Sequence, residues 1–559
     1  MLMQRFLGDP GEEVCVVLRW RGPGAPTAVI CPGLAVGAAE PRYLLPILAR
    51  ELHELGWNTF QFDYLGDGDS AGDHSRVTLG TATASTERVV AFAESLGCGG
   101  FALVGYGVGN VVTACLAARE RVRAVALIAP HLPVFNGGNG PVWEALDRLD
   151  TSGGAVFPQS SHADGPLGAL LRATVGEAVV PAQPCGPISP GFLQELRTVR
   201  PQEWLARSST PLLVVSDNSG DALARPAAPA AFRPIDHTPS GYRPSWHWCA
   251  ECREGVLGAL REWLREHLPA PAPREPGLSP RPPPPPLPDG AGEDFRPGER
   301  VRACSFAREV RGETVLGVLH VPPRGAPHRP VGLVYEVGIP GQRVDVHRCG
   351  PRTAAALAGL GFYVLRYDAR GMGLSDGDFS EVTWTRKLED LRQVMDAVSA
   401  LGPDRFVVLG NSAGARMAYL AANRCDRVAG CVSWGPILVE PEERVGEGVL
   451  RRHPSGRLVT EYCGLWLGVA YNLDERRYDF LDEFRRCRKP GLVLFAREEE
   501  NRVNKERMRE IAREMPGTVV REVPGTHGFA PEAVPEVIGA TTEWLVELAA
   551  GLDGAPVGG

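Results

Sequence analysis

The chain has 559 residues, of which 44% are hydrophobic and 23% charged, and its formal net charge at pH 7 is −8. This composition is typical of a soluble globular protein, and the length is that of roughly two to four domains. The acidic balance argues against a nucleic-acid partner, which would need a basic face.

The first residues, MLMQRFLGDPGEE, lack the basic stretch and apolar core of a signal peptide. The most apolar long window is 101–118, but glycines interrupt it, which favours a buried strand, turn and helix over a membrane span. The 13 cysteines show no disulfide spacing. We therefore predict no membrane insertion and a cytoplasmic location.

Cys249 and Cys252 form a CxxC motif, but no second pair and no nearby histidine pair completes a zinc site. We interpret the two cysteines as residues at the start of a helix. The sequence contains neither a phosphate-cradling glycine loop with a lysine nor a metal-ligand cluster. We therefore predict no metal and no organic cofactor.

Residues 269–297 are rich in proline and contain the run Pro282–Pro286. Such a segment is typical of a semi-rigid linker in polyproline conformation. It separates a predicted first domain, residues 1–268, from a predicted second domain, residues 298–550. Residues 551–559 are predicted to form a flexible tail.

The two halves repeat each other. Three landmark residues recur in the same order and at the same spacing: Gly33, Asp63 and Gly107, then Gly338, Asp368 and Ser412. An ungapped match of this length indicates duplication of a whole domain. Within each half, short apolar strand-like runs alternate with helix-like runs, so we predict two tandem α/β domains. Each has a mostly parallel sheet with helices on both faces, and its functional residues follow the carboxyl ends of the strands.

The segment GNSAG, residues 410–414, fits the nucleophile-elbow pattern G-x-S-x-G between a strand-like and a helix-like run. The turn is tight enough that side chains two residues from the serine would clash, so Gly410 and Gly414 are required. Ser412 is the predicted nucleophile. The backbone N–H of Ala413 is a predicted oxyanion donor.

A serine nucleophile needs a base, and in this motif's fold the acid and then the histidine follow the serine along the chain. His527, in VPGTHGF, is the predicted base. Three carboxylates follow the penultimate strand-like run: Glu498, Glu499 and Glu500. Counting from the strand favours Glu499, whereas counting back from Val503 favours Glu500, which we prefer.

A second oxyanion donor is expected in the loop after the first inner strand. Pro340 has no N–H, so Ile339 is the best candidate. Arg343, His347 and Arg348 follow. Two interpretations stay open for them: they bind a substrate carboxylate or phosphate, or they form a basic surface loop.

These motifs make the second half, roughly residues 300–548, resemble the α/β-hydrolases of the serine aminopeptidase-like (S33) group. More narrowly, it resembles hydrolases associated with the exosortase A system, whose pattern is close to GGPQ-x-R-VGSHR and then R-F-D-x-R-G-M-G-D-S-x-G; here the text is GIPGQRVDVHR and RYDARGMGLSDG. The resemblance implies Ser412 as nucleophile, His527 as base and an acid within 498–500. The chain departs from the pattern with Glu in place of the usual acid Asp, and with Leu374 in place of Asp.

The first half resembles the same superfamily across about residues 10–268. Asp217 and His247 stand where relics of the acid and the base are expected. Gly107 replaces the serine and has no side chain to activate, so we predict a degenerate, non-catalytic copy. We expect it to contact the second domain within the same chain.

Residues 437–488 are too long for a simple loop and are predicted to form a helical lid over Ser412. Two interpretations are open for Trp466, Leu467, Tyr471 and Leu473: they line an apolar acyl pocket, or they form the core of the lid. The corresponding insertion of the first half, 131–209, is predicted to be loose.

The sequence thus predicts a serine hydrolase that acts on an ester or thioester of a small acyl compound, free or bound to a carrier. Two alternatives remain open at this point. One is an acyltransferase that uses the same triad with an alcohol or amine acceptor, and the other is a binding or scaffold pseudoenzyme.

Overall fold

The computed structural model describes residues 1–34, 37–39, 42–130, 190–216, 230–236, 246–268, 300–327, 329–439, 450–499, 501–529 and 533–553. Contacts divide the chain into two compact units, Met1–Pro286 with Cys463–Leu465, and Leu287–Tyr462 with Trp466–Gly559. The predicted linker, 269–297, lies outside the described residues, as do residues 131–189 of the predicted loose insertion. The rest of that insertion contains two short helices, Pro190–Thr198 and Pro201–Arg207, so this part is not loose. The predicted domain boundaries stay a prediction. Residues 551–553, assigned above to the tail, belong to the last helix.

The first unit contains an eight-stranded sheet of order β1-β2-β4-β3-β5-β6-β7-β8. Strands β1 and β2 are antiparallel to their neighbours, and the pairs from β4 to β8 are parallel. The strands are β1 (Leu2–Leu7), β2 (Val14–Arg19), β3 (Thr27–Cys31), β4 (Asn58–Phe62), β5 (Phe101–Tyr106), β6 (Val122–Ile128), β7 (Leu212–Ser216) and β8 (Ala230–Pro234). Strand β5, at the centre of the sheet, is buried along its whole length, as the apolar run FALVGY requires.

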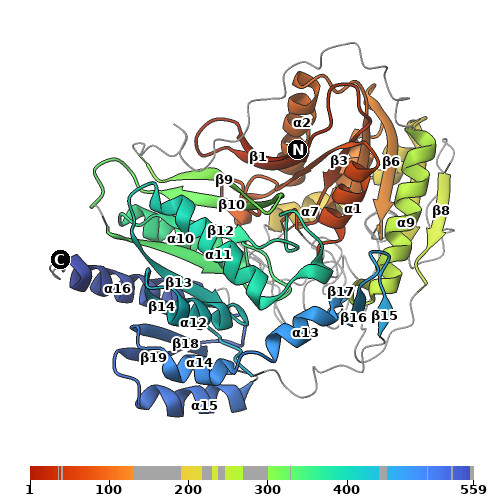
Figure 1. Cartoon of the computed structure of the whole chain (residues 1–559). Helices are drawn as coiled ribbons and strands as arrows, with labels where there is room; N and C mark the ends of the chain where they lie inside the picture. Colours follow the sequence, from red (N-terminus) through yellow and green to blue (C-terminus); the bar gives the residue numbers. More distant parts are fainter. Residues whose placement is uncertain are drawn as a thin grey trace, which may run out of the picture. The chain divides into compact units, whose positions relative to one another are not determined.

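Helices cover both faces of this sheet. They are α1 (Leu44–Glu54), α2 (Leu79–Ser95), α3 (Val108–Leu116), α7 (Pro190–Thr198), α8 (Pro201–Arg207) and α9 (Ala250–His267), with 3₁₀ turns η1 (His74–Arg76) and η4 (Trp246–Trp248). Helices α1 and α9 pack together and share one apolar core with β3, β5, β6 and β7 (Figure 1). Helices α2 and α3 contact each other and lie against the strands from the other face.

The second unit repeats the same strand order, β9-β10-β12-β11-β13-β14-β18-β19. Again the first two strands are antiparallel to their neighbours and the remaining pairs are parallel. The strands are β9 (Arg302–Val310), β10 (Glu313–Val321), β11 (Val331–Glu336), β12 (Val364–Asp368), β13 (Arg405–Asn411), β14 (Val428–Trp434), β18 (Gly491–Ala496) and β19 (Thr518–Val523). This order and these directions, present twice, are those of an α/β-hydrolase sheet, so the predicted tandem fold is confirmed.

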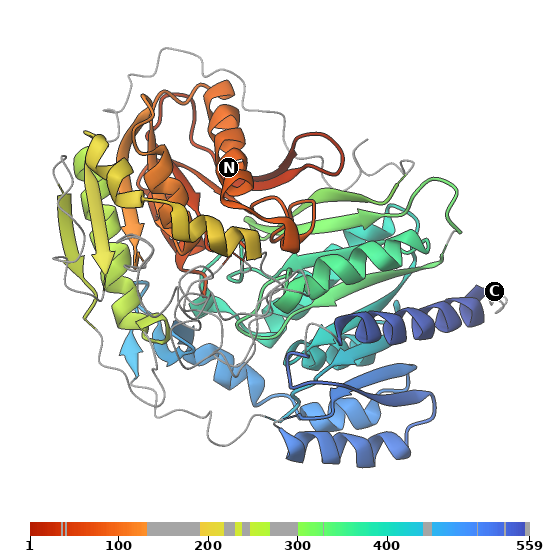
Figure 2. The ribbon, with the colours of Figure 1, turned by 180° about the vertical axis from the view of Figure 1, so that it is seen from behind.

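The helices of the second unit also lie on two faces. They are α10 (Cys349–Gly359), α11 (Trp384–Ser399), α12 (Gly414–Arg424), α13 (Val469–Glu475), α14 (Phe480–Arg486), α15 (Arg502–Arg513) and α16 (Val534–Asp553), with 3₁₀ turns η6 (Val346–Arg348) and η7 (Phe379–Glu381). Helix α10 contacts α16, and α11 contacts α12 (Figures 1 and 2). Among the described helices, none has the length and apolarity that a membrane span requires.

Residues 450–488 correct the prediction of a purely helical lid. They contain a small sheet of β15 (Arg451–Arg452), β16 (Leu458–Tyr462) and β17 (Leu465–Gly468), followed by the short helices α13 and α14. The Tyr462 hydroxyl donates to the Ile339 carbonyl at 3.2 Å, so this segment reaches the predicted oxyanion loop. Residues 440–449 of the predicted lid lie outside the described residues.

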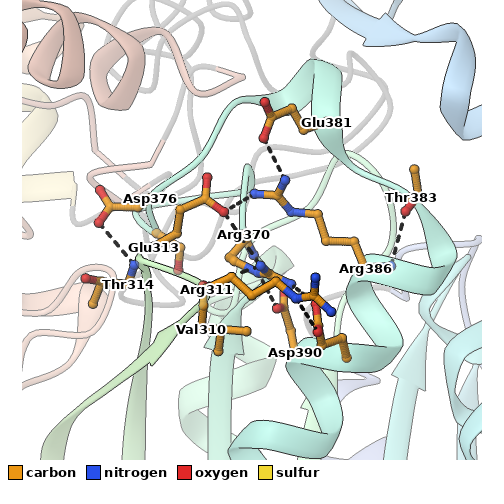
Figure 3. A network of polar contacts seen from close by, with 12 residues as sticks. Val310, Arg311, Glu313, Thr314, Arg370, Asp376, Glu381, Thr383, Arg386 and Asp390 are labelled. Carbon is orange, nitrogen blue, oxygen red and sulfur yellow. Dashed lines mark hydrogen bonds and ion pairs between the residues drawn. The ribbon is translucent and has the colours of Figure 1, made fainter.

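A network of arginines and carboxylates supports the same region (Figure 3). Arg370 is almost buried and binds Asp390 at 2.5 Å and Glu389 at 2.7 Å. Figure 3 shows Arg370 and Arg386 converging on Glu313, at the start of β10. Arg386 also binds Glu381, which pairs in turn with Arg457 between β15 and β16. The network therefore joins β10, the loop after β12, α11 and the 450–488 segment.

A buried ion pair fixes the turn after β12. The Asp368 carboxylate accepts the N–H of Arg343 at 2.8 Å and of Leu374 at 3.1 Å. It also binds Nη1 of Arg343 at 3.0 Å, and both side chains are only 1% exposed. In the first unit, Asp63 accepts the N–H of Ala38 and Asp69 in the same way, without an arginine.

Arg343→Met is expected to lower the free energy of unfolding of the second unit by roughly 3 kcal/mol, because it leaves a buried carboxylate without its cation. Urea denaturation of the full chain checks this. Arg485→Met is the matched control, since Arg485 is 59% exposed, and is expected to change stability by less than about 1 kcal/mol. Equal losses of unfolding free energy in the two variants would contradict the assignment of Arg343 and Asp368 as a buried ion pair.

Candidate active site

Ser412 stands on a strained turn between β13 and α12. Its φ is +55°, the left-handed region that non-glycine residues rarely adopt. A Cβ at Gly410 would lie 2.5 Å from Ala415 backbone atoms, and a Cβ at Gly414 would lie 2.4 Å from the Glu336 carbonyl oxygen. The two glycines are therefore sterically required. The Ser412 N–H donates to the Trp434 carbonyl at 2.8 Å, which fixes the turn against β14.

The structure brings His527 to this serine. Its Nε2 lies 3.0 Å from the Ser412 Oγ, and its Nδ1 lies 3.0 Å from the Glu499 Oε1. His527 comes from the loop after β19. Gly435, at the end of β14 with φ +46°, leaves room for the ring: a Cβ there would lie 3.3 Å from the His527 Nδ1. Serine, imidazole and carboxylate thus form one line of hydrogen bonds.

Glu499 follows β18 and is 4% exposed. Burial raises the pKa of its carboxyl, but the hydrogen bond and charge of His527 outweigh burial and bring the pKa below 4.5. The carboxylate therefore stays ionised at neutral pH, as a group that orients an imidazole must. Glu498 is exposed, and Glu500, the acid preferred from the sequence, lies outside the described residues.

The loop after β11 passes close to the serine. A Cβ added to Gly338 would lie 3.3 Å from the Ser412 Cβ and 3.5 Å from the Ala413 nitrogen. Within the described part of the chain, the backbone N–H groups of Ile339 and Ala413 donate to no protein acceptor. Buried donors without an acceptor are uncommon, and two of them beside one nucleophile fit an oxyanion hole.

A buried charge pair anchors that loop, and the sequence analysis missed it. The Lys387 Nζ lies 3.2 Å from the Glu336 Oε2 and donates to the Val337 carbonyl at 3.2 Å. The Tyr367 hydroxyl also binds Glu336. Lys387 and Glu336 are 1% and 2% exposed. Because they fix the last residues of β11, they hold Gly338 and Ile339 in place. A lysine among the apolar positions of a predicted helix was the available signal.

Asp345 is a second residue that the sequence analysis missed. Its φ and ψ are 60° and 173°, a region that is essentially restricted to glycine. The carboxylate accepts the Tyr335 hydroxyl at 2.6 Å, the Val346 N–H at 2.7 Å and the Asn411 amide. Burial raises the pKa of Asp345, and its hydrogen bonds oppose that shift. These contacts fix the side chain of the residue before Ser412, which accounts for a strained backbone at this position.

The predicted basic loop has another role. Arg343 is committed to Asp368 and so is not available to a substrate anion. His347 is 8% exposed, and its ring lies near the backbone of Phe529, two residues after His527. Burial lowers the pKa of His347 to about 4, so the ring is neutral at pH 7. Neither residue forms the anion-binding surface that was one interpretation of the sequence.

The four residues of the predicted acyl pocket have different surroundings in the structure. The Arg451 guanidinium lies over the Trp466 ring, 4.9 Å from its centroid. Leu467 and Tyr471 are buried, the latter against Trp384, whereas Leu473 is 58% exposed. Trp466 thus packs within the 450–488 segment, whereas Tyr471 joins that segment to the start of α11.

The first unit retains the turn without the nucleophile. Gly107 has φ +58°, close to the value of Ser412. His247 is fully buried, and its Nε2 lies 2.9 Å from the hydroxyl of Tyr106, the residue before Gly107. Its ring also contacts Trp246, with a centroid distance of 3.8 Å. Asp217 lies outside the described residues.

Among the described residues, one group of metal-ligating types comes together: Cys15, Asp63 and Asp69, with one ligand atom each within 4.8 Å. The two oxygens of Asp63 already accept backbone N–H groups. Burial, then the charges of Asp69 and Asp67, raise the pKa of Asp63 to about 7. We interpret Asp63 as a residue that fixes the turn after β4, not as a metal ligand.

Gly435→Ala is expected to slow sulfonylation of Ser412 by phenylmethanesulfonyl fluoride by on the order of 10-fold or more, because the new methyl displaces the His527 ring. Gly517→Ala is the matched control: its φ is also positive, at +83°, but the nearest atom to its Cβ is 3.9 Å away. Mass spectrometry of the modified protein gives both rates. Equal rates in the two variants would show that Gly435 makes no room for the base.

Residues 344–460 match the family described as serine aminopeptidase, S33. A search of the curated proteins found no match. Among solved structures, Est1E from Butyrivibrio proteoclasticus with bound ferulic acid is 23% identical, with a TM-score of 0.38, and the match covers 44% of this chain and 99% of that chain. The thioesterase domain from the curacin biosynthetic pathway is 15% identical, with a TM-score of 0.32 and coverage of 43% and 99%.

The enol-lactonase from Burkholderia xenovorans is 19% identical, with a TM-score of 0.35, and covers 43% of this chain and 100% of that chain. The sheet order described above and the family match within the second unit agree with each other. The chain therefore contains two tandem sheets with the strand order of the α/β-hydrolase fold, and the central segment of its second unit resembles the serine aminopeptidases of family S33.

Proposed function

We propose that the second unit is a serine hydrolase that cleaves an ester or thioester of a small acyl compound through an acyl-enzyme at Ser412. The observation that supports this best is the unbroken line of contacts from Glu499 through His527 to the Ser412 hydroxyl, each at 3.0 Å. A serine hydroxyl becomes a nucleophile when a base within hydrogen-bond distance accepts its proton. The catalytic domain is placed at residues 298–550.

The reaction follows from the roles that the geometry offers. Ser412 Oγ attacks the acyl carbon while His527 Nε2 takes its proton, and Glu499 stabilises the imidazolium that forms. The carbonyl oxygen becomes an oxyanion, which the N–H groups of Ile339 and Ala413 can bind. His527 then protonates the leaving alcohol or thiol. Water, activated by the same imidazole, releases the acid and restores Ser412.

The first unit, residues 1–268, has a non-catalytic role in this proposal. Gly107 carries no nucleophile where Ser412 stands in the second unit. His247 is buried against Tyr106 and Trp246. A buried tyrosine–histidine pair of this kind stabilises a core.

Ser412→Ala is expected to lower kcat for p-nitrophenyl acetate and for a short acyl thioester by about 10⁴-fold or more, since no other group accepts the acyl chain. Ser455→Ala, at an exposed serine of the same unit, is the control and is expected to keep full activity. Initial rates measured at equal protein concentration give the comparison. Turnover that survives Ser412→Ala would refute the proposal.

Glu499→Gln is expected to lower kcat by about 10³- to 10⁴-fold, because an amide cannot stabilise the imidazolium. The folded pKa of Glu499 lies below its ordinary 4.5. Its ionised form therefore stabilises the folded state above that pH, and the contribution disappears as pH falls through the folded value. Urea denaturation of both proteins should thus show a stability difference at pH 7 that shrinks below pH 4.5. A difference independent of pH would contradict the role of the carboxylate.

A further inference from the structure

The CxxC motif of the first unit is not used by the proposed reaction. Cys249 precedes α9 and Cys252 lies in its first turn; α9 packs along β6 and β7 (Figures 1 and 2). The Cys252 thiol donates to the Cys249 sulfur, and the two sulfur atoms lie 2.7 Å apart. That distance is longer than the roughly 2.05 Å of a disulfide bond, so the two sulfurs are close together but not bonded to each other.

Cys249 caps the start of α9. Its sulfur accepts the N–H of Cys252 at 3.3 Å, as the capping atom of an 18-residue helix. A CxxC motif at a helix N-terminus is a common site of thiol–disulfide exchange. The Cys252 thiol lies next to this acceptor and also contacts the Asp236 carbonyl at 3.2 Å.

The two sulfurs differ in their access to solvent. Cys249 is 5% exposed, whereas Cys252 is half-buried. A partly accessible thiol beside a buried one is the arrangement in which one sulfur reacts with an oxidant and the other then displaces it. In the same unit, Cys15, Cys31 and Cys98 are buried and Cys115 is exposed.

A metal site fits the pair less well. Zinc bound by thiolates takes four ligands in proteins. Among the described residues, no third histidine, cysteine or carboxylate joins Cys249 and Cys252 within ligand distance.

We propose that Cys249 and Cys252 are a redox-active dithiol that closes reversibly to an intramolecular disulfide in exchange with low-molecular-weight disulfides such as glutathione disulfide. Cys252 loses its proton to solvent and attacks one sulfur of the small disulfide, which forms a mixed disulfide and releases one thiolate. Cys249 then loses its own proton to solvent and attacks the Cys252 sulfur, which releases the second thiolate. The protein gives up two electrons, and one small disulfide becomes two thiols.

The test equilibrates the full chain in buffers that range from reduced glutathione to glutathione disulfide. After acid quenching, the free thiols are alkylated with N-ethylmaleimide, the protein is digested, and the peptide that contains both cysteines is weighed. The expected result is a peptide that is unalkylated and lighter by two hydrogen atoms, increasing with the oxidised fraction and disappearing after dithiothreitol treatment. Cys115→Ser is the control and should leave this change intact.

Cys249→Ser separates the two steps. Serine is a good helix N-cap, so the helix start is preserved. Without the second sulfur, the glutathione adduct on Cys252 is expected to accumulate. The proposal is overturned if both cysteines remain fully alkylated in glutathione disulfide, if the parent protein stops at the adduct, or if the isolated chain holds zinc on the pair.

Discussion

Both units depend on the close approach of the helix after the glycine turn to the end of the neighbouring strand, which is β11 in the second unit and β3 in the first. In the second unit, a Cβ at Gly414 would lie 2.4 Å from the Glu336 carbonyl oxygen. In the first unit, a Cβ at Gly109 would lie 2.1 Å from the Cys31 carbonyl oxygen. Steric overlap of that size excludes every residue except glycine, whatever the chemistry of the turn. This explains why the first unit keeps the turn although its central residue is Gly107.

The two units share this backbone geometry but differ in their buried charged residues. In two places, the charged partner or partners of the second unit correspond to neutral residues in the first. Where Glu336 and Lys387 meet beneath the oxyanion loop, the corresponding positions of the first unit hold Cys31 and Ala82. The backbone N–H of Arg370 binds the Asp390 carboxylate, and in the same geometry the N–H of Leu65 binds the Ser85 hydroxyl. A buried ion pair can give way to neutral residues at little cost, whereas loss of one partner is expensive. The pair of Glu336 and Lys387 lies at the end of β11, where it fixes the loop that carries Gly338 and Ile339.

The sequence predicted the parts of the site that local rules determine. Ser412 follows from the glycine spacing of its turn, and His527 follows from its order after the acid loop. The sequence did not identify the acid. Glu498, Glu499 and Glu500 are adjacent, and the direction in which the loop turns decides which of them can face His527. Asp345 and Lys387 were missed because their roles depend on contacts across the fold. Both interpretations left open for Arg343, a ligand of a substrate anion or part of a basic surface loop, missed its partner Asp368, which is distant in sequence. The 450–488 segment was predicted as helical because β16 and β17 are too short to give a clear alternating pattern.

In the proposed function, Ser412 is the one serine that the fold activates. Labelling of the intact, full-length protein with a fluorophosphonate probe tests it most directly, with the modified peptide identified by mass spectrometry. We expect one adduct, on the peptide that contains Ser412, and none on the first unit. A protein that remains unlabelled while folded, or an adduct elsewhere with Ser412 unmodified, would contradict it.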